Sequence, residues 1–360
     1  MCNVNEYIIN KKNLSDNVTK IRRYVGNRTQ ICAVVKANAY GLGVKNVCPI
    51  IDDEVDFYAV VSVMEALEVR DISPTKPILI LGSTDLAFAN TCAEKNIRLS
   101  ISSADEVEYL NKNLDRVIKV HLKLNTGMNR YGVSNVRDLK NILKKISESD
   151  KIVLEGVYTH FATKSSDVKF IDTQYEKLQK FLTYLPKKGL IVHCASSYVT
   201  LSDRQKFCNM VRVGFSLYSG FYERLNIKDV VSIKARVMYV HTVNSGESIG
   251  YDRTYVAKCR RKIAICSMGY ADGFARNLSN NFKVLINGSW ASVVGRVCMD
   301  CFMADVTDIK NVYVGTGVTI LGKDGDHEIT LQDIAEKADF SAYEVLLNFR
   351  QRRMNVVLKE

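Results

Sequence analysis

The chain has 360 residues, of which 47% are hydrophobic, so it can bury a large core, and its length predicts about two domains. The formal net charge of +11 draws attention to nucleic acid, but the basic residues stand as scattered pairs such as Lys144-Lys145 among acidic neighbours, which is typical of solvated helix faces. Residues 1–12 lack a signal-peptide pattern and no segment approaches about 20 uninterrupted apolar residues, so we expect a soluble, cytoplasmic protein or the excised domain of a membrane-anchored parent.

The first part of the chain, up to about residue 220, alternates between strand and helix patterns. Short β-branched runs are followed by longer charged stretches that carry apolar residues at helical spacing, which predicts βα units around a parallel sheet. The expected strands are residues 31–35, 56–61, 77–81, 97–101, 117–124, 154–161, 190–195 and 211–218. Eight such strands predict an α/β fold, an N-terminal (β/α)8 TIM-like barrel whose site lies at the carboxyl ends of the strands.

The pattern changes after residue 222, where strands become closely spaced and turns such as Asn287-Gly288 separate them. This predicts a C-terminal mainly-β domain. Its expected strands are residues 231–240, 262–268, 283–286, 291–295, 302–306 and 318–321. We expect the barrel to span residues 1–228 and the β domain residues 229–360, with residues 1–10 able to join the β domain.

Lys36 follows the first apolar run and precedes a loop that contains Gly41 and Gly43. A desolvated lysine at the end of a strand has a lowered pKa and readily forms Schiff bases. The glycines let backbone amides approach a ligand at a helix start, which favours an anion site. A snorkelling lysine before an ordinary turn explains the same spacing about as well.

Five segments in chain order carry a resemblance to a known family. They are AVVKANAYGLG (residues 33–43), THFA (159–162), VRVGFSLYSG (211–220), GYADGF (269–274) and VGRVCMD (294–300). Together they resemble the motifs of the alanine racemase family, enzymes of fold type III that depend on pyridoxal phosphate (PLP). The resemblance implies a homodimer with shared active sites and, for a bacterial chain, D-alanine for peptidoglycan, the cell-wall polymer.

The resemblance implies a reaction with two bases. Racemisation removes the proton on Cα, and PLP supplies the electron sink that makes this proton acidic enough. One base alone would return its own proton and restore the original hand, so each face needs a base of its own. By resemblance, Lys36 holds PLP and is one base, Tyr270 of the neighbouring subunit is the other, and His160 supports this tyrosine.

The resemblance also implies the cofactor contacts. Arg212 matches the arginine that faces the pyridine nitrogen, where a fixed positive charge keeps this nitrogen unprotonated. Tyr40 and Ser197, with the backbone near Gly214 and Phe215, match phosphate contacts.

Three further residues are implied at the substrate. Arg130 resembles the arginine near the cofactor's phenolic oxygen and the substrate carboxylate, and the main-chain amide of Met299 would hold that carboxylate. Lys123 matches a lysine that can be carbamylated to orient Arg130.

Some positions depart from the usual family pattern, mainly around the substrate. Asn125 and Asn129 stand where Asp and often Gly are common, Ser196 replaces an asparagine, and Gln351 stands where many members have a tyrosine. The segment ASSY (residues 195–198) also resembles serine-racemising relatives associated with glycopeptide resistance. Alanine is therefore the first choice of substrate, and serine, or both amino acids, is the alternative.

Other functions remain open at the level of the sequence. A PLP-dependent decarboxylase of the same barrel class lacks support, because the chain has no Gly-Gly-Gly run, and a non-catalytic PLP-binding protein would be a lone barrel. Most of the ten cysteines lie in apolar strands, which favours reduced thiols, and Cys298 and Cys301 lack the second pair that a zinc site needs. We therefore expect a small amino-acid substrate and no metal, nucleic acid or membrane partner.

Overall fold

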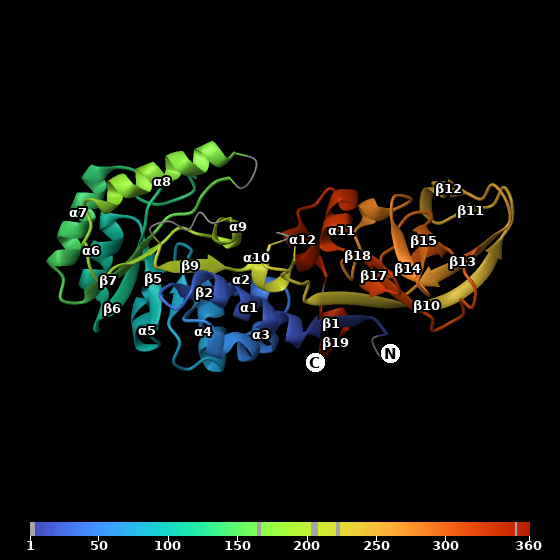
Figure 1. Cartoon of the computed structure of the whole chain (residues 1–360), viewed down its shortest axis with the longest axis horizontal. Coiled ribbons are helices and arrows are strands. Elements are labelled where there is room, and N and C mark those ends of the chain that lie inside the picture. Colours follow the sequence, from blue (N-terminus) through green and yellow to red (C-terminus); the bar gives the residue numbers. More distant parts are fainter. Residues whose placement is uncertain (1–3, 164–166, 203–207, 221–223, 350) are drawn as a thin grey trace. The chain divides into compact units, whose positions relative to one another are not determined.

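The computed structural model describes residues 4–163, 167–202, 208–220, 224–349 and 351–360. The chain forms two compact units, one made of Leu14–Ala39 and Gly43–Ile227 and the other of Tyr40–Leu42, Lys228–Glu360 and the described part of Met1–Asn13. Both are visible along the chain in Figure 1. Across the described ranges, no helix has both the length and the apolar character needed to cross a membrane.

The first unit, called the barrel unit below, contains eight parallel strands in the order β8-β7-β6-β5-β4-β3-β2-β9. They are β2 (Gln30–Val34), β3 (Phe57–Val60), β4 (Ile78–Ile80), β5 (Ile97–Ile101), β6 (Ile118–Lys123), β7 (Ile152–Tyr158), β8 (Ile191–His193) and β9 (Met210–Val213). Backbone hydrogen bonds join the outer two, from Asn209 N to Val192 O at 3.1 Å and from Arg212 N to Ala195 O at 2.8 Å. The barrel is nearly closed, and the predicted fold class is confirmed.

Helices alternate with these strands. They are α1 (Lys11–Val25), α3 (Val44–Ile51), α4 (Val63–Ile72), α5 (Ala89–Glu94), α6 (Ala104–Asn113), α7 (Val136–Ser147), α8 (Val168–Leu182), α9 (Ser197–Leu201) and α10 (Phe215–Tyr218). The short segment α2 (Lys36–Tyr40) is a left-handed turn, not an ordinary α-helix. Side chains cap the N-termini of several of these helices. At α6, Ser103 and Glu106 form a reciprocal capping box that satisfies free N–H groups of the first turn. Strands β3, β4 and β5 are buried along their whole length, as expected where helices cover a parallel sheet.

The last expected barrel strand, residues 211–218, is only half correct. The strand ends at Val213, and α10 follows. The chain turns at Gly214, because the N–H groups of Gly214 and Ser216 donate to Ser197 Oγ at 3.1 and 3.3 Å. A hydroxyl on a different segment therefore ends this strand, which an apolar run cannot indicate.

The second unit, called the β unit below, is built on a nine-stranded sheet in the order β18-β17-β14-β15-β16-β13-β10-β1-β19, with an additional pairing of β17 with β10. The strands are β1 (Glu6–Asn10), β10 (Val231–Val243), β13 (Arg261–Cys266), β14 (Lys283–Ile286), β15 (Ser289–Val293), β16 (Phe302–Asp305), β17 (Gly317–Asp324), β18 (His327–Ile329) and β19 (Asn355–Lys359). A small hairpin, β11 (Ser248–Ile249) and β12 (Tyr255–Val256), and the helices α11 (Leu331–Ala338) and α12 (Ala342–Asn348) complete it. The mainly-β character is confirmed.

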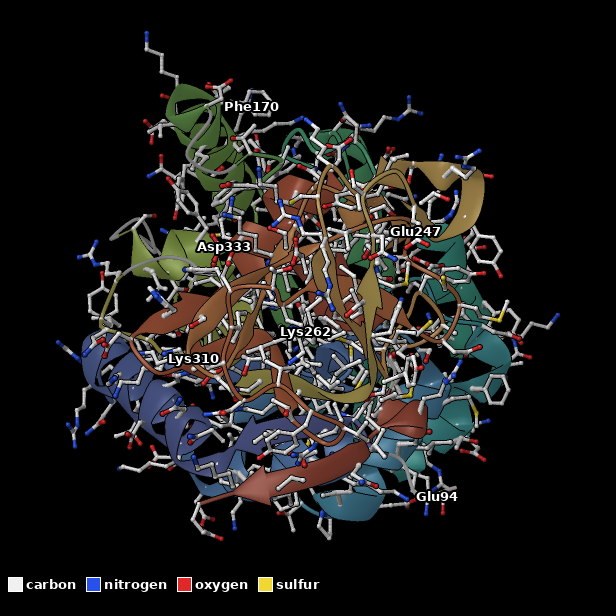
Figure 2. All side chains as sticks on the ribbon, turned by 90° about the vertical axis from the view of Figure 1, so that its right-hand side faces the viewer. Glu94, Phe170, Glu247, Lys262, Lys310 and Asp333 are labelled. Carbon is white, nitrogen blue, oxygen red and sulfur yellow. The ribbon has the colours of Figure 1, made fainter. Side chains whose placement is uncertain are left out.

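Charged side chains lie on the surface of both units. Glu94, Glu247 and Asp333 are exposed, and Figure 2 labels their positions. The interior is mainly apolar, with Ile31 and Leu122 fully buried in the barrel unit and Phe274 and Phe302 in the β unit. The polar residues that interrupt the barrel interior are therefore informative.

Candidate active site

Lys36 lies just beyond the carboxyl end of β2, and a left-handed turn follows it. Ala37, Asn38, Ala39 and Tyr40 have φ values between 51° and 56°. This conformation costs a residue with a Cβ roughly 1–2 kcal/mol, so four in succession need strong support from their surroundings. Backbone strain of this kind is concentrated at functional sites.

Hydrogen bonds supply that support. The Ala37 N–H donates to Glu65 Oε1 at 2.7 Å, and the Val44 N–H at the start of α3 donates to Asn38 Oδ1 at 2.9 Å. Glu65 and Asn38 thus hold the turn from both sides, which fixes the direction in which Lys36 leaves the strand.

The environment of Lys36 favours its neutral amine. Burial lowers the pKa of Lys36, the charge of Arg130 lowers it further, and Glu65 acts against both. A larger fraction of neutral amine at neutral pH makes this side chain a better nucleophile toward a carbonyl group.

Lys123, at the end of β6, is buried. Its Nζ lies 4.4 Å from the ring centroid of Tyr158 and 5.5 Å from that of Tyr131. Burial lowers the pKa of Lys123 to about 6, with additional repulsion from Arg212 and Arg130. Its amine is therefore mostly neutral at pH 7.

Arg130 lies in the loop that follows β6, with its guanidinium carbon 5.3 Å from the ring centroid of Tyr131. The preceding Asn129 has a φ of 55°, a conformation that asparagine tolerates better than most residues. The Asn125 side chain accepts from the N–H groups of Gly127 and Asn129 at 3.1 and 3.0 Å and so shapes this loop. The two unusual asparagines are thus compatible with the loop.

Arg212 on β9 is buried, and the protein uses most of its hydrogen-bond donors. Its Nη1 donates to His193 Nδ1 at 3.0 Å and to His193 O at 2.8 Å. Its Nη2 donates to Thr159 O at 2.9 Å and to His160 Nδ1 at 3.2 Å. A guanidinium has five N–H groups. The Nε–H therefore remains as the one Arg212 donor without an acceptor among the described residues.

His160, at the end of the β7 segment, is held neutral. Burial lowers the pKa of His160 well below its usual value, and the charges of Arg212, Lys123, Arg130 and Lys36 act in the same direction. Of these groups, Arg212 contacts the ring directly, with its Nη2 3.2 Å from His160 Nδ1. Because Nδ1 accepts from Arg212, the proton of the neutral ring lies on Nε2.

Ser197 gathers donors from the segment after β9. Besides the two backbone N–H groups, the Ser216 hydroxyl donates to Ser197 Oγ at 3.1 Å. Gly214, Phe215 and Ser216 are all buried here. Three donors directed at one point form a site that a phosphate oxygen can share.

The predicted residues of the β unit are also close to one another. The N–H of Tyr270 donates to Cys298 O at 3.1 Å, and the N–H of Ala271 donates to Met299 O at 3.0 Å. A Cβ on Gly269 would lie 2.3 Å from Met299 O, so only glycine allows this approach. Tyr270 and Met299 are 42% and 54% exposed, so both side chains point away from the packed core.

Tyr40 groups with the β unit, whereas the other predicted cofactor residues belong to the barrel unit. Its ring centroid lies 6.1 Å from that of Tyr343, and burial raises the pKa of its phenol.

Three polar residues of the barrel interior were not singled out from the sequence: His121 on β6, Glu155 on β7 and His193 on β8. Both histidines are fully buried, and His193 contacts Arg212 directly. The available signal was a histidine next to apolar residues in β6 and in β8, and an acidic residue in the apolar run of β7.

Comparisons with known proteins agree over nearly the full length of the chain. The family models "Alanine racemase, N-terminal domain" and "Alanine racemase, C-terminal domain" match residues 9–221 and 230–357. "Alanine racemase 2" of Caldanaerobacter subterraneus subsp. tengcongensis is 35% identical over 357 residues, covering 96% of this chain and 92% of the relative.

Solved structures are similar over the same length. Alanine racemase from E. faecalis has 30% identity and a TM-score of 0.93, covering 99% of this chain and 98% of that one. A histidine racemase from Leuconostoc mesenteroides subsp. sake has 27% identity and a TM-score of 0.88, covering 100% and 99%. With both family domains matched in order and relatives similar over nearly their full length, the chain belongs to the alanine racemase family.

Proposed function

We propose that this chain interconverts L- and D-alanine by a PLP-dependent reaction that uses two bases, Lys36 and Tyr270. The observation that carries the proposal is the match of both alanine racemase domains along one chain. The partly buried Lys36, whose pKa is lowered, also supports the proposal, because a neutral amine is the nucleophile that forms a Schiff base.

The alanine racemase family depends on PLP, and the residues of the barrel unit fit this cofactor. Lys36 offers an amine, the Arg212 Nε–H is free to face a ring nitrogen, and the donors around Ser197 suit a phosphate. We assign His160, Gly214 and Phe215 to the same cofactor site, and we propose Tyr40, which groups with the β unit, as a further phosphate contact. When bound, PLP delocalises the electron pair left on Cα after the proton is removed.

Lys36 Nζ would take or return the Cα proton on one face of the substrate. Tyr270 of the partner subunit would do so on the other face, since this phenol is 42% exposed on its own chain. A neutral His160 carries its proton on Nε2 and can donate it to a phenolate, which lowers the cost of ionising tyrosine. The proposal therefore requires a homodimer. We also propose that the protein acts in the cytoplasm.

The substrate carboxylate would be held by Arg130 and the main-chain amide of Met299. We also propose that Lys123 is carbamylated. A neutral amine adds carbon dioxide and loses one proton to give a carbamate anion, and the pKa of Lys123 near 6 makes that amine available. The anion would attract and orient Arg130.

Serine, alone or with alanine, is the second candidate substrate. Ser196 and Gln351 depart from the usual alanine racemase residues, and a similar fold in the Leuconostoc neighbour belongs to a histidine racemase. The fold is therefore compatible with more than one amino acid, and side chains around the substrate decide the choice. The domains assigned from the sequence, residues 1–228 and 229–360, stay part of this proposal.

The experiment is to follow the circular dichroism of L-alanine and of L-serine, separately, with purified PLP-loaded protein. We expect the ellipticity to decay to zero faster with L-alanine. Lys36→Ala should abolish the decay with either amino acid, and Tyr270→Phe should slow it by orders of magnitude, because each removes one base. Faster decay with L-serine would assign the chain to the serine-racemising relatives, and no decay with either would overturn the proposal.

A further inference from the structure

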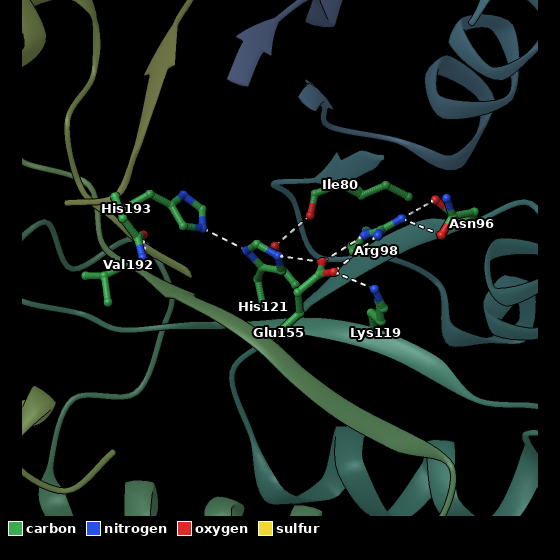
Figure 3. Close-up of polar contacts among 10 residues, drawn as sticks. Ile80, Asn96, Arg98, Lys119, His121, Glu155, Val192 and His193 are labelled. Atoms are coloured by element: carbon green, nitrogen blue, oxygen red, sulfur yellow. Dashed lines mark hydrogen bonds and ion pairs between the residues drawn. The ribbon is translucent and has the colours of Figure 1, made fainter. Parts of the chain in front are cut away.

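A continuous chain of polar side chains crosses the interior of the barrel unit. It runs from Glu155 through His121 and His193 to Arg212, and Figure 3 shows its first three members side by side. Glu155 Oε2 lies 3.3 Å from His121 Nε2, His121 Nδ1 lies 2.8 Å from His193 Nε2, and His193 Nδ1 lies 3.0 Å from Arg212 Nη1. Every ring nitrogen of the two histidines is used.

The two ends of this chain determine its direction. Arginine can only donate hydrogen bonds, and a carboxylate can only accept them. His193 Nδ1 must therefore accept from Arg212, which places the proton of His193 on Nε2. That proton is donated to His121 Nδ1, so His121 also carries its proton on Nε2 and donates it to Glu155.

Two cationic side chains keep Glu155 charged through both of its carboxylate oxygens. Arg98 contacts it through Nε at 2.8 Å and Nη2 at 3.2 Å, and Lys119 Nζ lies 2.9 Å from Oε1. Burial acts to raise the pKa of Glu155, but the hydrogen bonds from His121, Arg98 and Lys119 outweigh it and lower the pKa. Glu155 is therefore the acceptor-only end that the chain requires.

Both histidines are neutral, as this arrangement demands. Burial lowers the pKa of His121 despite the opposing effect of Glu155. Burial and the charge of Arg212 lower the pKa of His193 well below its usual value. An arginine does not give up a proton at neutral pH. The row of hydrogen bonds therefore orients the two imidazole rings and the guanidinium, and it does not conduct protons to Arg212.

We propose that Glu155 and His121 are positioning residues for racemisation, which act through His193 to hold the Arg212 guanidinium with its Nε–H directed at the cofactor site. The inference rests on the proposed function, in which Arg212 faces the ring nitrogen of PLP. The donor-only Arg212 stands at one end of this row of hydrogen bonds, so an acceptor-only residue must stand at the other end. If the last residue also donated, two N–H groups would face each other at one of the junctions, and a hydrogen bond that holds Arg212 would be lost.

The first test is nitrogen NMR on the PLP-loaded protein labelled with ¹⁵N-histidine at pH 7. The chain has five histidines, so few signals need assignment, and the loss of one signal pair in His121→Asn identifies His121. We expect His121 and His193 to be neutral with the proton on Nε2. A proton on Nδ1 of either ring, or a doubly protonated ring, would overturn the proposal.

The second test uses Glu155→Gln, which keeps the shape of the side chain but replaces the acceptor-only end by a group that also donates. We expect altered nitrogen signals of both rings and a kcat lower by about tenfold or more, with KM for alanine within about threefold, as is usual when outer partners of a site are lost. Lys119→Met is the matched control, because Lys119 contacts the other carboxylate oxygen and its side chain is half exposed. Because Arg98 still holds the carboxylate through two hydrogen bonds, Lys119→Met should keep both rings neutral with the proton on Nε2 and leave kcat unchanged.

His121→Asn interrupts the chain while Arg98 and Lys119 keep their partner, so it tests the proposal even if Glu155→Gln does not fold. The same loss of kcat at equal PLP content is expected. Unchanged kcat in a folded variant would overturn the inference and leave the racemase proposal intact. If the unaltered protein racemises neither alanine nor serine, the proposed function fails, while the nitrogen signals still decide the tautomers.

Discussion

Lys123 shows how far the surroundings of one side chain change its chemistry. It is 4% exposed, and burial together with Arg212 and Arg130 lowers its pKa from 10.5 to about 6. Between these two values the unfolded chain binds one more proton than the folded one. The free energy of unfolding therefore gains a contribution that rises with pH from about 6 to 10.5.

We expect Lys123→Met to remove this contribution. The variant should be more stable than the unaltered protein at pH 7, and its advantage should shrink at pH 9, because the cost of deprotonating the buried lysine falls as pH rises. Urea unfolding at both pH values, in buffer purged of carbon dioxide, measures the difference. Lys112→Met, at an exposed lysine, is the control. Equal pH dependence of the two variants would contradict the prediction.

At the scale of elements, strands β6 and β7 are matched to one another at His121. Gly156 pairs with His121 across the two strands. A Cβ at residue 156 would lie 2.5 Å from His121 Nδ1 and 2.6 Å from its Cε1. The absence of a side chain on β7 thus makes room for the imidazole on β6.

Gly156→Ala should destabilise the barrel unit by about 1–3 kcal/mol, the usual cost of overpacking a core, because the fixed ring cannot move away. Chemical denaturation measures this loss, and a shift of the His121 nitrogen signals should accompany it. Gly317→Ala is a suitable control, since nothing lies within 4 Å of its added Cβ. A folded Gly156→Ala protein of unchanged stability would show that the ring has room to move.

Strand positions followed from the sequence more reliably than strand ends. The interiors of all eight barrel strands were predicted, since apolar runs of this length are a local property. The end of β9 was missed because Ser197 binds the chain at Gly214. In the β unit, β1 pairs with both β10 and β19, and neither β1 nor β19 was among the predicted strands. Residues 355–359 contain the apolar run 356–358 but are exposed, so the alternation of buried and exposed positions that indicates a half-buried strand is absent there.

At the scale of the whole molecule, the proposed homodimer makes a prediction that does not depend on a structure of the complex. If Lys36 of one subunit works with Tyr270 of the other, Lys36→Ala and Tyr270→Phe chains should complement each other. Random mixing would restore roughly a quarter of the sites, because half of the dimers are mixed and each has one intact site.

The two variants should be unfolded together, refolded at equal concentrations and tested for racemisation of L-alanine. Each variant refolded by itself is the control. Activity no higher in the mixture than in the separate variants would argue against a shared site and for one completed within a single chain.

The class of the fold and the order of the domains followed from periodicity in the amino-acid sequence, which is a local property. The candidate site residues followed from short motifs, such as the one around Lys36, through their resemblance to the alanine racemase family. Which polar residues meet in the interior depends on the folded chain. His121 and His193 are 72 residues apart in sequence, yet their rings lie 2.8 Å apart. Barrel closure brings their strands together and excludes water, so each buried donor must find an acceptor there.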